Sequence, residues 1–433
     1  MRTKTINYDI AIIGAGYVGL DLAIAFSKKY SVIIYDISKN RVKELNKGLD
    51  SNKQHKSKDF LNKNLFFTNN EDLIKDLNFY IVTVPTPITN LKKPDLTMLI
   101  NASKLIGRSI KKKSIVVFES TTFPGCTEEI CAPIIERYSK LKYQKDFDLA
   151  YSPERVNPGD KINVIKSITK VIGANNNKTL LKVKNLYQNI CNSIYTTKTI
   201  KIAESAKAIE NIQRDINISL VNELSIIFNK LKIPTNEVLK AASTKWNFHY
   251  YKPGLVGGHC ISVDPYYLAF KAKQKKYFPN IILSGRELNE SMPKYIAKQS
   301  IHLMRENKVN LKNSLVCVLG FSFKENIPDI RNTKIIKIID ELKKKGVKNI
   351  KIFDGIVSKK NSKKEYGVNI NNFKDINKFK FDLIILAVSH KVFLKKLSFY
   401  NKFYRNKKKL FVDIKNNYSV EDFKKNKYEY FQL

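Results

Sequence analysis

The side chain of this sequence best suited to covalent chemistry is a cysteine in a glycine-rich segment. Cys260 follows Gly257, Gly258 and His259, and Asp264 lies four residues beyond it. A thiolate is a strong nucleophile toward an aldehyde, and a nearby carboxylate can handle protons. A single cysteine is more often a small buried hydrophobic residue, so the catalytic interpretation depends on what the rest of the chain supplies.

A lysine and an asparagine one helical turn apart form a second candidate pair. Lys207 and Asn211 are four residues apart within a segment of helical periodicity, so they share one face of that helix. A lysine on a helix is ordinarily solvated. If this face lines a cleft, the ammonium group can instead donate to a developing alkoxide, as an oxyanion hole does.

A glycine-rich turn near the start of the chain predicts a dinucleotide site. An apolar run over Tyr8–Ile13 leads into Gly-Ala-Gly-Tyr-Val-Gly, a helical pattern follows, and a β-branched run over Ser31–Tyr35 ends on an acid. This order of elements makes the pattern specific. The glycines admit pyrophosphate at the helix N-terminus, and the acid can bind both ribose hydroxyls. The residues predicted to contact the cofactor here are Gly14, Gly16, Tyr17, Val18, Gly19, Asp36 and Arg41.

The acid at the end of the second run favours NAD over NADP. The carboxylate of Asp36 would repel a 2′-phosphate. Arg41 is the one nearby residue that qualifies this prediction, since an arginine there could also lie over the adenine.

Three further apolar runs are expected to place loops around the cofactor. The runs over 79–84, 114–118 and 147–151 each end in a polar or proline-rich turn, as strands of a continuing parallel sheet do. Ligands of such sheets bind at the carboxyl ends of the strands. The turns that follow are therefore candidate site loops, and they supply Pro85, Thr86, Ser120, Thr121, Glu154 and Arg155.

A helical pattern without glycine runs over Lys201–Leu231 and ends before Pro234. This is long for a helix of a globular protein, so we expect it to connect two domains. Its apolar stripe also predicts the seam of a homodimer. The stripe consists of Ile209, Ile212, Ile216, Leu220 and Leu224.

The last third of the chain repeats the alternation of strands and helices, which indicates a second doubly wound domain. It lacks a GxGxxG pattern, so we expect it to bind something other than a second NAD. The predicted elements are strands near 315–319, 349–353, 383–388 and 410–412, a turn at 320–329 and a helix near 334–345.

The predicted fold class is α/β, with two Rossmann-like doubly wound domains joined by a long central helix and a helical middle domain. The expected boundaries are 1–200 for the NAD-binding domain, 201–305 for the helical domain with the catalytic loop and the dimer seam, and 306–433 for the second Rossmann-like domain. The lysine-rich stretches 359–364 and 407–409 predict surface loops, and the final ten residues are expected to fray.

Composition excludes several classes of function. The 78 basic and 39 acidic residues give a net charge of +39, but only ten of the basic residues are arginine and the lysines are scattered, as on solvated surfaces rather than a nucleic-acid site. Five widely spaced cysteines fit a reducing compartment. We find no secretory pattern and no apolar run long enough to span a bilayer. The sequence therefore predicts a cytoplasmic protein with no nucleic-acid partner, no membrane partner and no metal.

Seven motifs, in order along nearly the whole chain, resemble those of the UDP-glucose/GDP-mannose dehydrogenase family. The resemblance implies an enzyme that uses NAD to oxidise the C6 alcohol of a nucleotide sugar to the carboxylate, a four-electron reaction through a thiohemiacetal and a thioester on the cysteine. The motifs are GAGYVGL at Gly14, VTVPTP at Val82, ESTTFPG at Glu119, SPERVNPGD at Ser152, AESAKAIEN at Ala203, GGHCISVDP at Gly257 and GFSFKENIPDIRNT at Gly320.

The resemblance also implies roles for individual residues. Cys260 matches the nucleophile, Lys207 the oxyanion-stabilising lysine, Asn211 a site asparagine and Asp264 an aspartate that handles water. Thr121 and Glu154 match residues that position the hydrolytic water, Lys324 matches a lysine that pairs with the UDP phosphates, and Arg331 matches an arginine near the junction of NAD and substrate. Arg155 and Arg286 are candidate substrate residues by motif, but a structural ion pair explains each of them equally well.

The residues flanking the cysteine resemble the N-acetylhexosamine branch of the family, which includes UDP-N-acetyl-D-glucosamine 6-dehydrogenases of Vi and related capsular polysaccharides. His259 precedes Cys260 here, and Val263-Asp264-Pro265 follows it. The predicted substrate is UDP-N-acetylglucosamine, or next UDP-N-acetylgalactosamine, with UDP-glucose and UDP-N-acetylmannosamine as alternatives. Gly257 and His259 are then substrate-side residues, and His259 contacts the acetamido group, tunes the Cys260 thiolate or packs.

Two other classes of protein remain as alternatives. A two-electron dehydrogenase of the 6-phosphogluconate or hydroxyacid type would share the first domain and the long helix but would not need Cys260. A binding module for nucleotide sugars or polyanions would have no chemical reason to keep the cysteine, lysine, asparagine and aspartate together.

Overall fold

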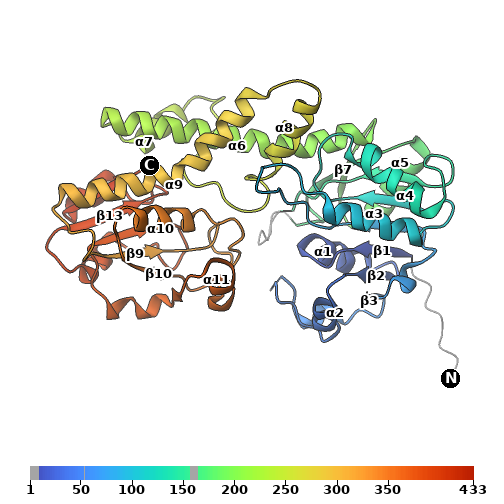
Figure 1. The fold of residues 1–433 in the computed structure, drawn as a ribbon, viewed down its shortest axis with the longest axis horizontal. Coiled ribbons are helices and arrows are strands. Elements are labelled where there is room, and N and C mark those ends of the chain that lie inside the picture. The colour runs from blue at the N-terminus through green and yellow to red at the C-terminus, as the bar shows by residue number, and fades with distance from the viewer. Residues whose placement is uncertain (1–8, 53, 157–163) are drawn as a thin grey trace. The chain divides into compact units, whose positions relative to one another are not determined.

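The structure, a computed structural model, describes residues 9–52, 54–156 and 164–433, which form two compact units. The first unit runs to residue 210 and includes 266–278, and the second contains 211–265 and 279–433. Each unit is built around one sheet with helices packed against it (Figure 1). The predicted α/β class is therefore confirmed. The predicted middle domain, 201–305, is divided between these two units. The boundaries of the three predicted domains therefore stay a prediction.

The sheet of the first unit has the strand order β3-β2-β1-β4-β5-β6-β7-β8, in which only the β6–β7 pair is antiparallel. Its central strands are buried on both faces, which explains their continuous apolar sequences. The predicted runs near 79–84, 114–118 and 147–151 are confirmed as parallel neighbours β4, β5 and β6. The strands are β1 (Ile10–Ile13), β2 (Val32–Tyr35), β3 (Leu65–Thr68), β4 (Phe79–Val82), β5 (Ile115–Phe118), β6 (Asp148–Tyr151), β7 (Thr169–Ala174) and β8 (Ser193–Thr197).

The helices of this unit bury apolar faces against the sheet. In α1 the buried side chains include Leu20, Ala23 and Phe26, which belong to the same apolar cluster as Ile10 and Ile12 of β1. Full burial of a leucine or phenylalanine contributes about 1.5–3 kcal/mol, so this cluster fixes the turn between β1 and α1. The helices are α1 (Tyr17–Phe26), α2 (Lys39–Asn46), α3 (Thr97–Ser109), α4 (Ala132–Ser139) and α5 (Asn177–Tyr187).

The predicted long helix is confirmed as α6 (Ile200–Leu231), which spans 32 residues. It ends where Lys232 takes a left-handed conformation with φ of 60° and Pro234 caps the next helix. The predicted apolar stripe is divided, because Ile209 and Leu220 are 56% and 52% exposed but Ile212 is buried. The other helices of the middle segment are α7 (Thr235–Ala242), α8 (Asp264–Gln274) and α9 (Asn280–Glu306).

The sheet of the second unit is entirely parallel, in the order β11-β10-β9-β12-β13-β14. Strand order reverses between β9 and β12, so the carboxyl ends of these two strands are where a ligand of such a sheet binds. The strands are β9 (Leu315–Leu319), β10 (Asn349–Phe353), β11 (Ile370–Asn371), β12 (Leu383–Leu386), β13 (Lys409–Asp413) and β14 (Tyr428–Gln432), and the helices are α10 (Ile335–Lys344), α11 (Lys359–Tyr366) and α12 (Val420–Lys425).

Two predictions about the lysine-rich parts of this unit were wrong. The stretch 359–364 forms most of α11, because Ser358 caps its first turn and Gly367 ends it in the left-handed conformation. The final residues do not fray, because β14 pairs with β13 and Leu433 is buried. Of the stretch 407–409, Lys407 and Lys408 are exposed, whereas Lys409 begins β13. Within the part of the chain that the structure describes, no helix has the length and apolarity to cross a membrane.

Candidate active site

The glycine-rich turn between β1 and α1 leaves room for a ligand at the helix N-terminus. Gly14 has a φ of +106°, and a Cβ on Gly19 would lie 1.9 Å from the Gly14 carbonyl oxygen. A Cβ on Gly16 would meet nothing within 4 Å. The first and third glycines therefore allow the tight turn, and the second leaves the backbone open to an approaching pyrophosphate. Tyr17 and Val18 are half-buried in the first turn of α1.

The acid after β2 lies where a ribose-binding acid is needed. Asp36 Oδ2 accepts from the backbone N–H of Ala15 at 2.8 Å, and Oδ1 accepts from that of Ser38 at 2.8 Å, while the side chain keeps partial exposure. Arg41 donates from Nε to the Ala15 carbonyl oxygen at 3.1 Å. Its charge is matched by Asp50 at 2.8 Å and by Glu44 at 3.0 Å. These residues fit a dinucleotide without a 2′-phosphate.

The loops after β4 and β5 are tied to each other. Thr86 Oγ1 donates to the Thr121 carbonyl oxygen at 2.7 Å, and Ser120 Oγ donates to the Val84 carbonyl oxygen at 2.7 Å. Pro85 is exposed between these two anchors. The structure therefore brings together the predicted residues of two loops at the carboxyl edge of the first sheet.

The loop after β6 holds the predicted lysine of α6. Lys207, which is 8% exposed, donates from Nζ to the Glu154 carbonyl oxygen at 2.7 Å. The Glu154 carboxylate accepts from the backbone N–H groups of Arg155 and Val156. The Arg155 guanidinium donates to the Thr169 carbonyl oxygen and pairs with Glu210, which favours the ion-pair explanation of this arginine. Residues 157–160 of this motif lie outside the described residues.

The cysteine lies in a tight turn at the start of α8. The Cys260 carbonyl oxygen accepts from the backbone N–H groups of Val263 at 2.9 Å and Asp264 at 2.8 Å, and the residue is partly exposed. The Asp264 side chain is 2% exposed, and its Oδ2 accepts from Asn211 Nδ2 at 2.5 Å. The second unit thus brings together three of the predicted residues, namely the thiol, the carboxylate and the amide.

The turn after β9 packs directly on the cysteine loop. A Cβ on Gly258 would lie 2.8 Å from the Phe323 ring, and the His259 ring meets the same ring edge-on with centroids 6.1 Å apart. The Gly258 carbonyl oxygen accepts from Asn332 Nδ2 at 3.1 Å. Of the three roles open to His259, packing is therefore observed. A Cβ on Gly257 would lie 2.9 Å from the Asn332 carbonyl oxygen, so this glycine is also required by packing.

The same turn carries two of the predicted basic residues, Lys324 and Arg331. The Lys324 carbonyl oxygen accepts from Ser322 Oγ at 2.7 Å, which fixes the backbone that carries the lysine. The Arg331 guanidinium forms an ion pair with Asp329, with Nε 3.0 and 3.1 Å from its two oxygens. Phe323 and Asn332 carry no chemistry of their own, so sequence reasoning did not single them out.

Arg286 forms buried ion pairs with Asp215 and Glu290. Its side chain is 1% exposed, and its guanidinium lies 2.6 Å from Asp215 and 2.6 Å from Glu290. Glu290 also pairs with Lys334 and Lys337. Burial alone would raise the pKa of Glu290, but these two lysines lower it to about 2. Of the two explanations offered for Arg286, the geometry favours the ion pair over substrate contact.

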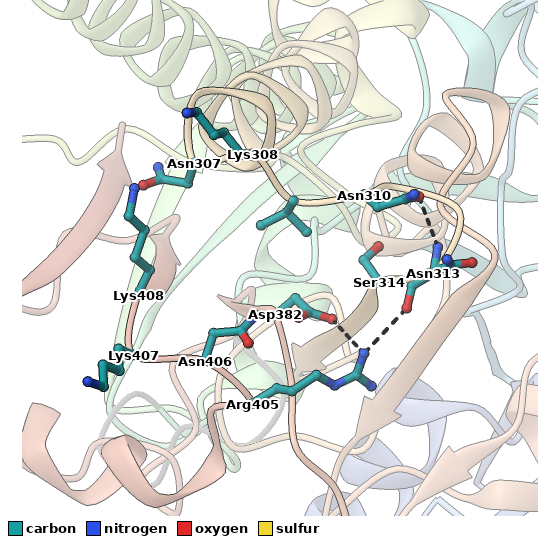
Figure 2. A pocket seen from close by; sticks show the side chains of 11 residues that line it. Asn307, Lys308, Asn310, Asn313, Ser314, Asp382, Arg405, Asn406, Lys407 and Lys408 are labelled. Carbon is teal, nitrogen blue, oxygen red and sulfur yellow. Dashed lines mark hydrogen bonds and ion pairs between the residues drawn. The ribbon is translucent and has the colours of Figure 1, made fainter.

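One pocket of the second unit is lined by none of the candidate site residues described above. It has a volume of about 380 Å³ and is lined by Lys308, Asp382, Arg405, Lys407 and Lys408 among others (Figure 2). Most of these residues precede β9, β12 and β13, so the pocket lies at the amino edge of the sheet, opposite the edge that binds ligands. Its one acid, Asp382, is engaged by Arg405 and by the backbone N–H of Leu315.

The described residues contain no disulfide among the five cysteines and no group of three side chains suited to a metal ion. The glycine turn and the acid after β2 are typical of a unit that binds a dinucleotide.

Comparison with known proteins identifies the family. Residues 8–191 match the NAD binding domain, 201–291 the central domain and 317–420 the UDP binding domain of the UDP-glucose/GDP-mannose dehydrogenase family. The chain belongs to this family, so it is a nucleotide-sugar dehydrogenase with an NAD binding domain. The resemblance inferred from the seven motifs is confirmed.

Several relatives extend over most of the chain. The UDP-N-acetyl-D-glucosamine 6-dehydrogenase of Salmonella typhi is 48% identical over 386 residues, which cover 89% of this chain and 90% of that protein. Protein CapL of Staphylococcus aureus is 46% identical over 90% of this chain and 91% of its own length. Among solved structures, UDP-D-ManNAc dehydrogenase of Pyrococcus horikoshii superposes with a TM-score of 0.85 at 28% identity, covering 95% of this chain and 96% of that one.

Proposed function

We propose that this enzyme oxidises the C6 hydroxyl of a UDP-N-acetylhexosamine to the carboxylate, with UDP-N-acetylglucosamine as the preferred sugar nucleotide and UDP-N-acetylgalactosamine next. Relatives named for UDP-N-acetyl-D-glucosamine are 46–48% identical to this chain. Relatives named for UDP-N-acetyl-D-mannosamine are 29–32% identical. The difference in identity supports the glucosamine substrate, and the product would serve surface polysaccharide synthesis.

The observation that carries the proposal is the turn at Cys260. The backbone N–H of Asp264 caps the Cys260 carbonyl, and the Asp264 carboxylate is held by Asn211. Asn211 is one helical turn from Lys207 on α6. A nucleophile, a carboxylate that can move a proton and two hydrogen-bond donors for an oxyanion are therefore carried by two short segments. A two-electron dehydrogenase would need no such thiol.

In the proposed reaction, C6 of the sugar is oxidised twice. Bound NAD would accept the hydride at each oxidation, held by the glycine turn and Asp36. Asp264, directly or through a water, takes the proton of the C6 hydroxyl, while Lys207 and Asn211 stabilise the alkoxide as the first hydride leaves C6. The Cys260 thiolate then adds to the aldehyde carbon, and the proton held by Asp264 returns to the oxygen to give a thiohemiacetal. This hydroxyl proton leaves again to Asp264 as a second hydride leaves C6, and a thioester results.

The last step releases the product. A water positioned by Thr121 and Glu154 attacks the thioester carbon, its proton passes to Glu154, and the C–S bond breaks to return the Cys260 thiolate. The released sugar carries a carboxylate at C6. Four electrons leave the substrate, which requires two molecules of NAD.

We also propose that the enzyme is a homodimer through α6. Ile209, Leu220 and Ile227 are 56%, 52% and 43% exposed on this helix, and spacings of 11 and seven residues keep them near one face. Exposed aliphatic residues aligned in this way support a protein interface. Light scattering tests it: Leu220→Glu should give monomers, and Arg214→Glu, at an exposed position on another side of the same helix, should leave the dimer intact.

The substrate assignment is tested by comparing kcat/KM for UDP-N-acetylglucosamine, UDP-N-acetylgalactosamine, UDP-N-acetylmannosamine and UDP-glucose. We expect the first to be the best substrate and UDP-glucose to be worse by roughly tenfold or more, because a site built around the acetamido group leaves buried polar groups unpaired without it. A higher kcat/KM for UDP-glucose than for UDP-N-acetylglucosamine would contradict the acetamido assignment. A higher kcat/KM for UDP-N-acetylmannosamine would show that the preferred substrate is the mannosamine epimer.

A further inference from the structure

A buried lysine lies directly behind the loop that carries Glu154. Lys170, the second residue of β7, has no exposed surface. Its Nζ lies 2.6 Å from Glu119 Oε2 and 3.7 Å from Glu154 Oε2, and it donates to the Pro153 carbonyl oxygen at 3.2 Å. A buried ammonium group is costly unless carboxylates and carbonyls compensate it, so these contacts constrain the surrounding loops strongly.

Both carboxylates belong to loops of the candidate site. Glu119 follows β5 and is two residues before Thr121, and its other oxygen accepts from the buried Tyr187 hydroxyl. Pro153 and Glu154 follow β6. Lys170 therefore links the loop of Thr121 to the loop of Glu154, and these are the two residues assigned to the hydrolytic water.

The constraint continues to the lysine of α6. The Glu154 carbonyl oxygen accepts from Lys207 Nζ at 2.7 Å, while Lys170 holds the carbonyl of the preceding residue. Two ammonium groups thus hold consecutive carbonyls of one loop. A shift of the Pro153–Glu154 peptide would move the Glu154 carboxylate and release Lys207 together.

We propose that Lys170 is a positioning residue for thioester hydrolysis, which holds the Pro153 carbonyl and the Glu154 carboxylate so that Glu154 can take the proton of the attacking water. This inference rests on the proposed function. In the step concerned, the oxygen of water bonds to the thioester carbon, the proton passes to Glu154, and the electrons of the C–S bond return to Cys260. Lys170 touches no reacting atom and acts through Glu154.

The pKa of Glu119 is consistent with this arrangement. Burial raises it to about 7, and Lys170 opposes the rise. Removing the lysine alone would leave two carboxylates facing each other, which would endanger folding. The test variant is therefore Glu119→Gln/Lys170→Met, which removes the ammonium group and one carboxylate and keeps both volumes.

The experiment mixes each full-length variant with NAD and excess UDP-N-acetylglucosamine, follows NADH in stopped flow, and measures the intact mass of the protein. Glu154→Gln serves as the marker of blocked hydrolysis. Tyr80→Phe, which removes buried hydrogen bonds to Ile74 and Ser109 at the amino end of β4, controls for lost stability. Thermal unfolding shows which variants are folded.

We expect the double variant to release a burst of nearly two NADH per site and then turn over roughly tenfold or more slowly, since small misplacements of a positioned group cost this much. A covalent adduct should accumulate on Cys260, as in Glu154→Gln, and should be absent from Tyr80→Phe. A folded double variant without adduct or slowing would overturn the inference, as would one that loses the burst itself.

Two further outcomes keep the inference separate from the proposed function. If the double variant does not fold, Lys170→Arg takes its place, because a planar guanidinium cannot occupy the same position, and a wild-type rate would then overturn the inference. If neither the wild type nor Glu154→Gln passes through an adduct and NADH release stops near one per sugar, the thioester route itself fails, whatever Lys170 does.

Discussion

The two α/β units contain the same turn, and they use it differently. Gly14 after β1 and Gly320 after β9 have φ values of +106° and +93°. In each unit the next residue donates its backbone N–H to an acid at the end of the neighbouring strand. The distance is 2.8 Å from Ala15 to Asp36 Oδ2 in the first unit and 2.9 Å from Phe321 to Asp354 Oδ2 in the second.

The two acids differ in what remains available to a ligand. Asp36 is partly exposed, whereas Asp354 is 3% exposed and lies 3.1 Å from Nε2 of the buried His390. The backbone N–H of Asn326 donates to His390 Nδ1, so Nε2 carries the proton that Asp354 accepts. The carboxylate of Asp354 is therefore occupied by hydrogen bonds within the protein and is not available to a ligand. Two Rossmann-like units therefore need not bind two dinucleotides, because ligand choice depends on the side chains around the turn.

Residues further along each turn extend the difference. Gly19 allows α1 to approach the Gly14 carbonyl, whereas Phe323 in the second turn fills space against Gly258 and His259. The first turn is open to a cofactor. The second turn instead supports the cysteine loop of the same unit.

The largest effect is expected from closing the open turn. In Gly19→Ala the new Cβ would lie 1.9 Å from a backbone oxygen, so the turn must shift. We expect NAD binding to weaken by about 3 kcal/mol, roughly a hundredfold, with a lower melting temperature. Gly355→Ala, beside Asp354, is the control because its Cβ would meet nothing within 4 Å. Calorimetry with NAD measures both, and wild-type affinity in Gly19→Ala would contradict the comparison.

The next effect separates the ligands of the two units. Lys324→Ala should raise KM for the UDP sugar by roughly ten- to a hundredfold, because a charge-assisted hydrogen bond contributes about 1.5–3 kcal/mol. KM for NAD should not change. Steady-state kinetics with each substrate varied in turn provides the measurement. If only the KM for NAD changed, the second unit would be the one that binds NAD, and the assignment would be wrong.

A comparable effect on stability is expected at the buried acid. Burial alone would raise the pKa of Asp354, but the hydrogen bond with His390 and those from the backbone N–H groups of Ile356 and Phe321 lower it below the usual value. A lowered pKa stabilises the fold above the unfolded value, about 3.9, and the stabilisation is lost as pH falls through the folded value. Asp354→Asn should therefore cost about 1–3 kcal/mol at pH 7 and progressively less below pH about 4. Urea unfolding at several pH values tests this, and a pH-independent difference would contradict it.

The smallest effect is expected at Asp36, the partly exposed acid of the first unit. Asp36→Asn should raise KM for NAD about tenfold, near 1.4 kcal/mol, and should allow some turnover with NADP, because the repulsion of a 2′-phosphate is removed. Stability should change little, since the asparagine oxygen can still accept from Ala15. The ratio of NADP to NAD turnover is the readout. An unchanged ratio would show that Asp36 does not face the ribose.

Much of the fold could be predicted because its signals are local. Apolar runs of four to six residues, a glycine turn and a glycine-free helical pattern located β1, β4, β5, β9, β10 and α6 closely. The helix α11 was missed because its only buried residue is Ser362, so it shows no apolar periodicity. The strand β14 was missed because lysines immediately precede it, although Tyr428 and Phe431 within it are buried.

The candidate site could be predicted only where chemistry sets residues apart. A cysteine beside glycines is distinctive, but Lys170 looks like any other lysine of a lysine-rich chain. The one signal was its position next to Val171 and Ile172 in a buried strand. A buried charge is costly unless an opposite charge or hydrogen bonds compensate it. Asp354 was missed because its partner, His390, is 36 residues away and only the parallel sheet brings them together.

The central claim is that Cys260 carries the substrate through a second oxidation, and the ratio of NADH formed to UDP-N-acetylglucosamine consumed tests it most directly. We predict a ratio near two for the wild type, and we predict that Cys260→Ser cannot complete the second oxidation. A wild-type ratio near one, or full four-electron turnover by the serine variant, would contradict the thioester mechanism and favour a two-electron dehydrogenase.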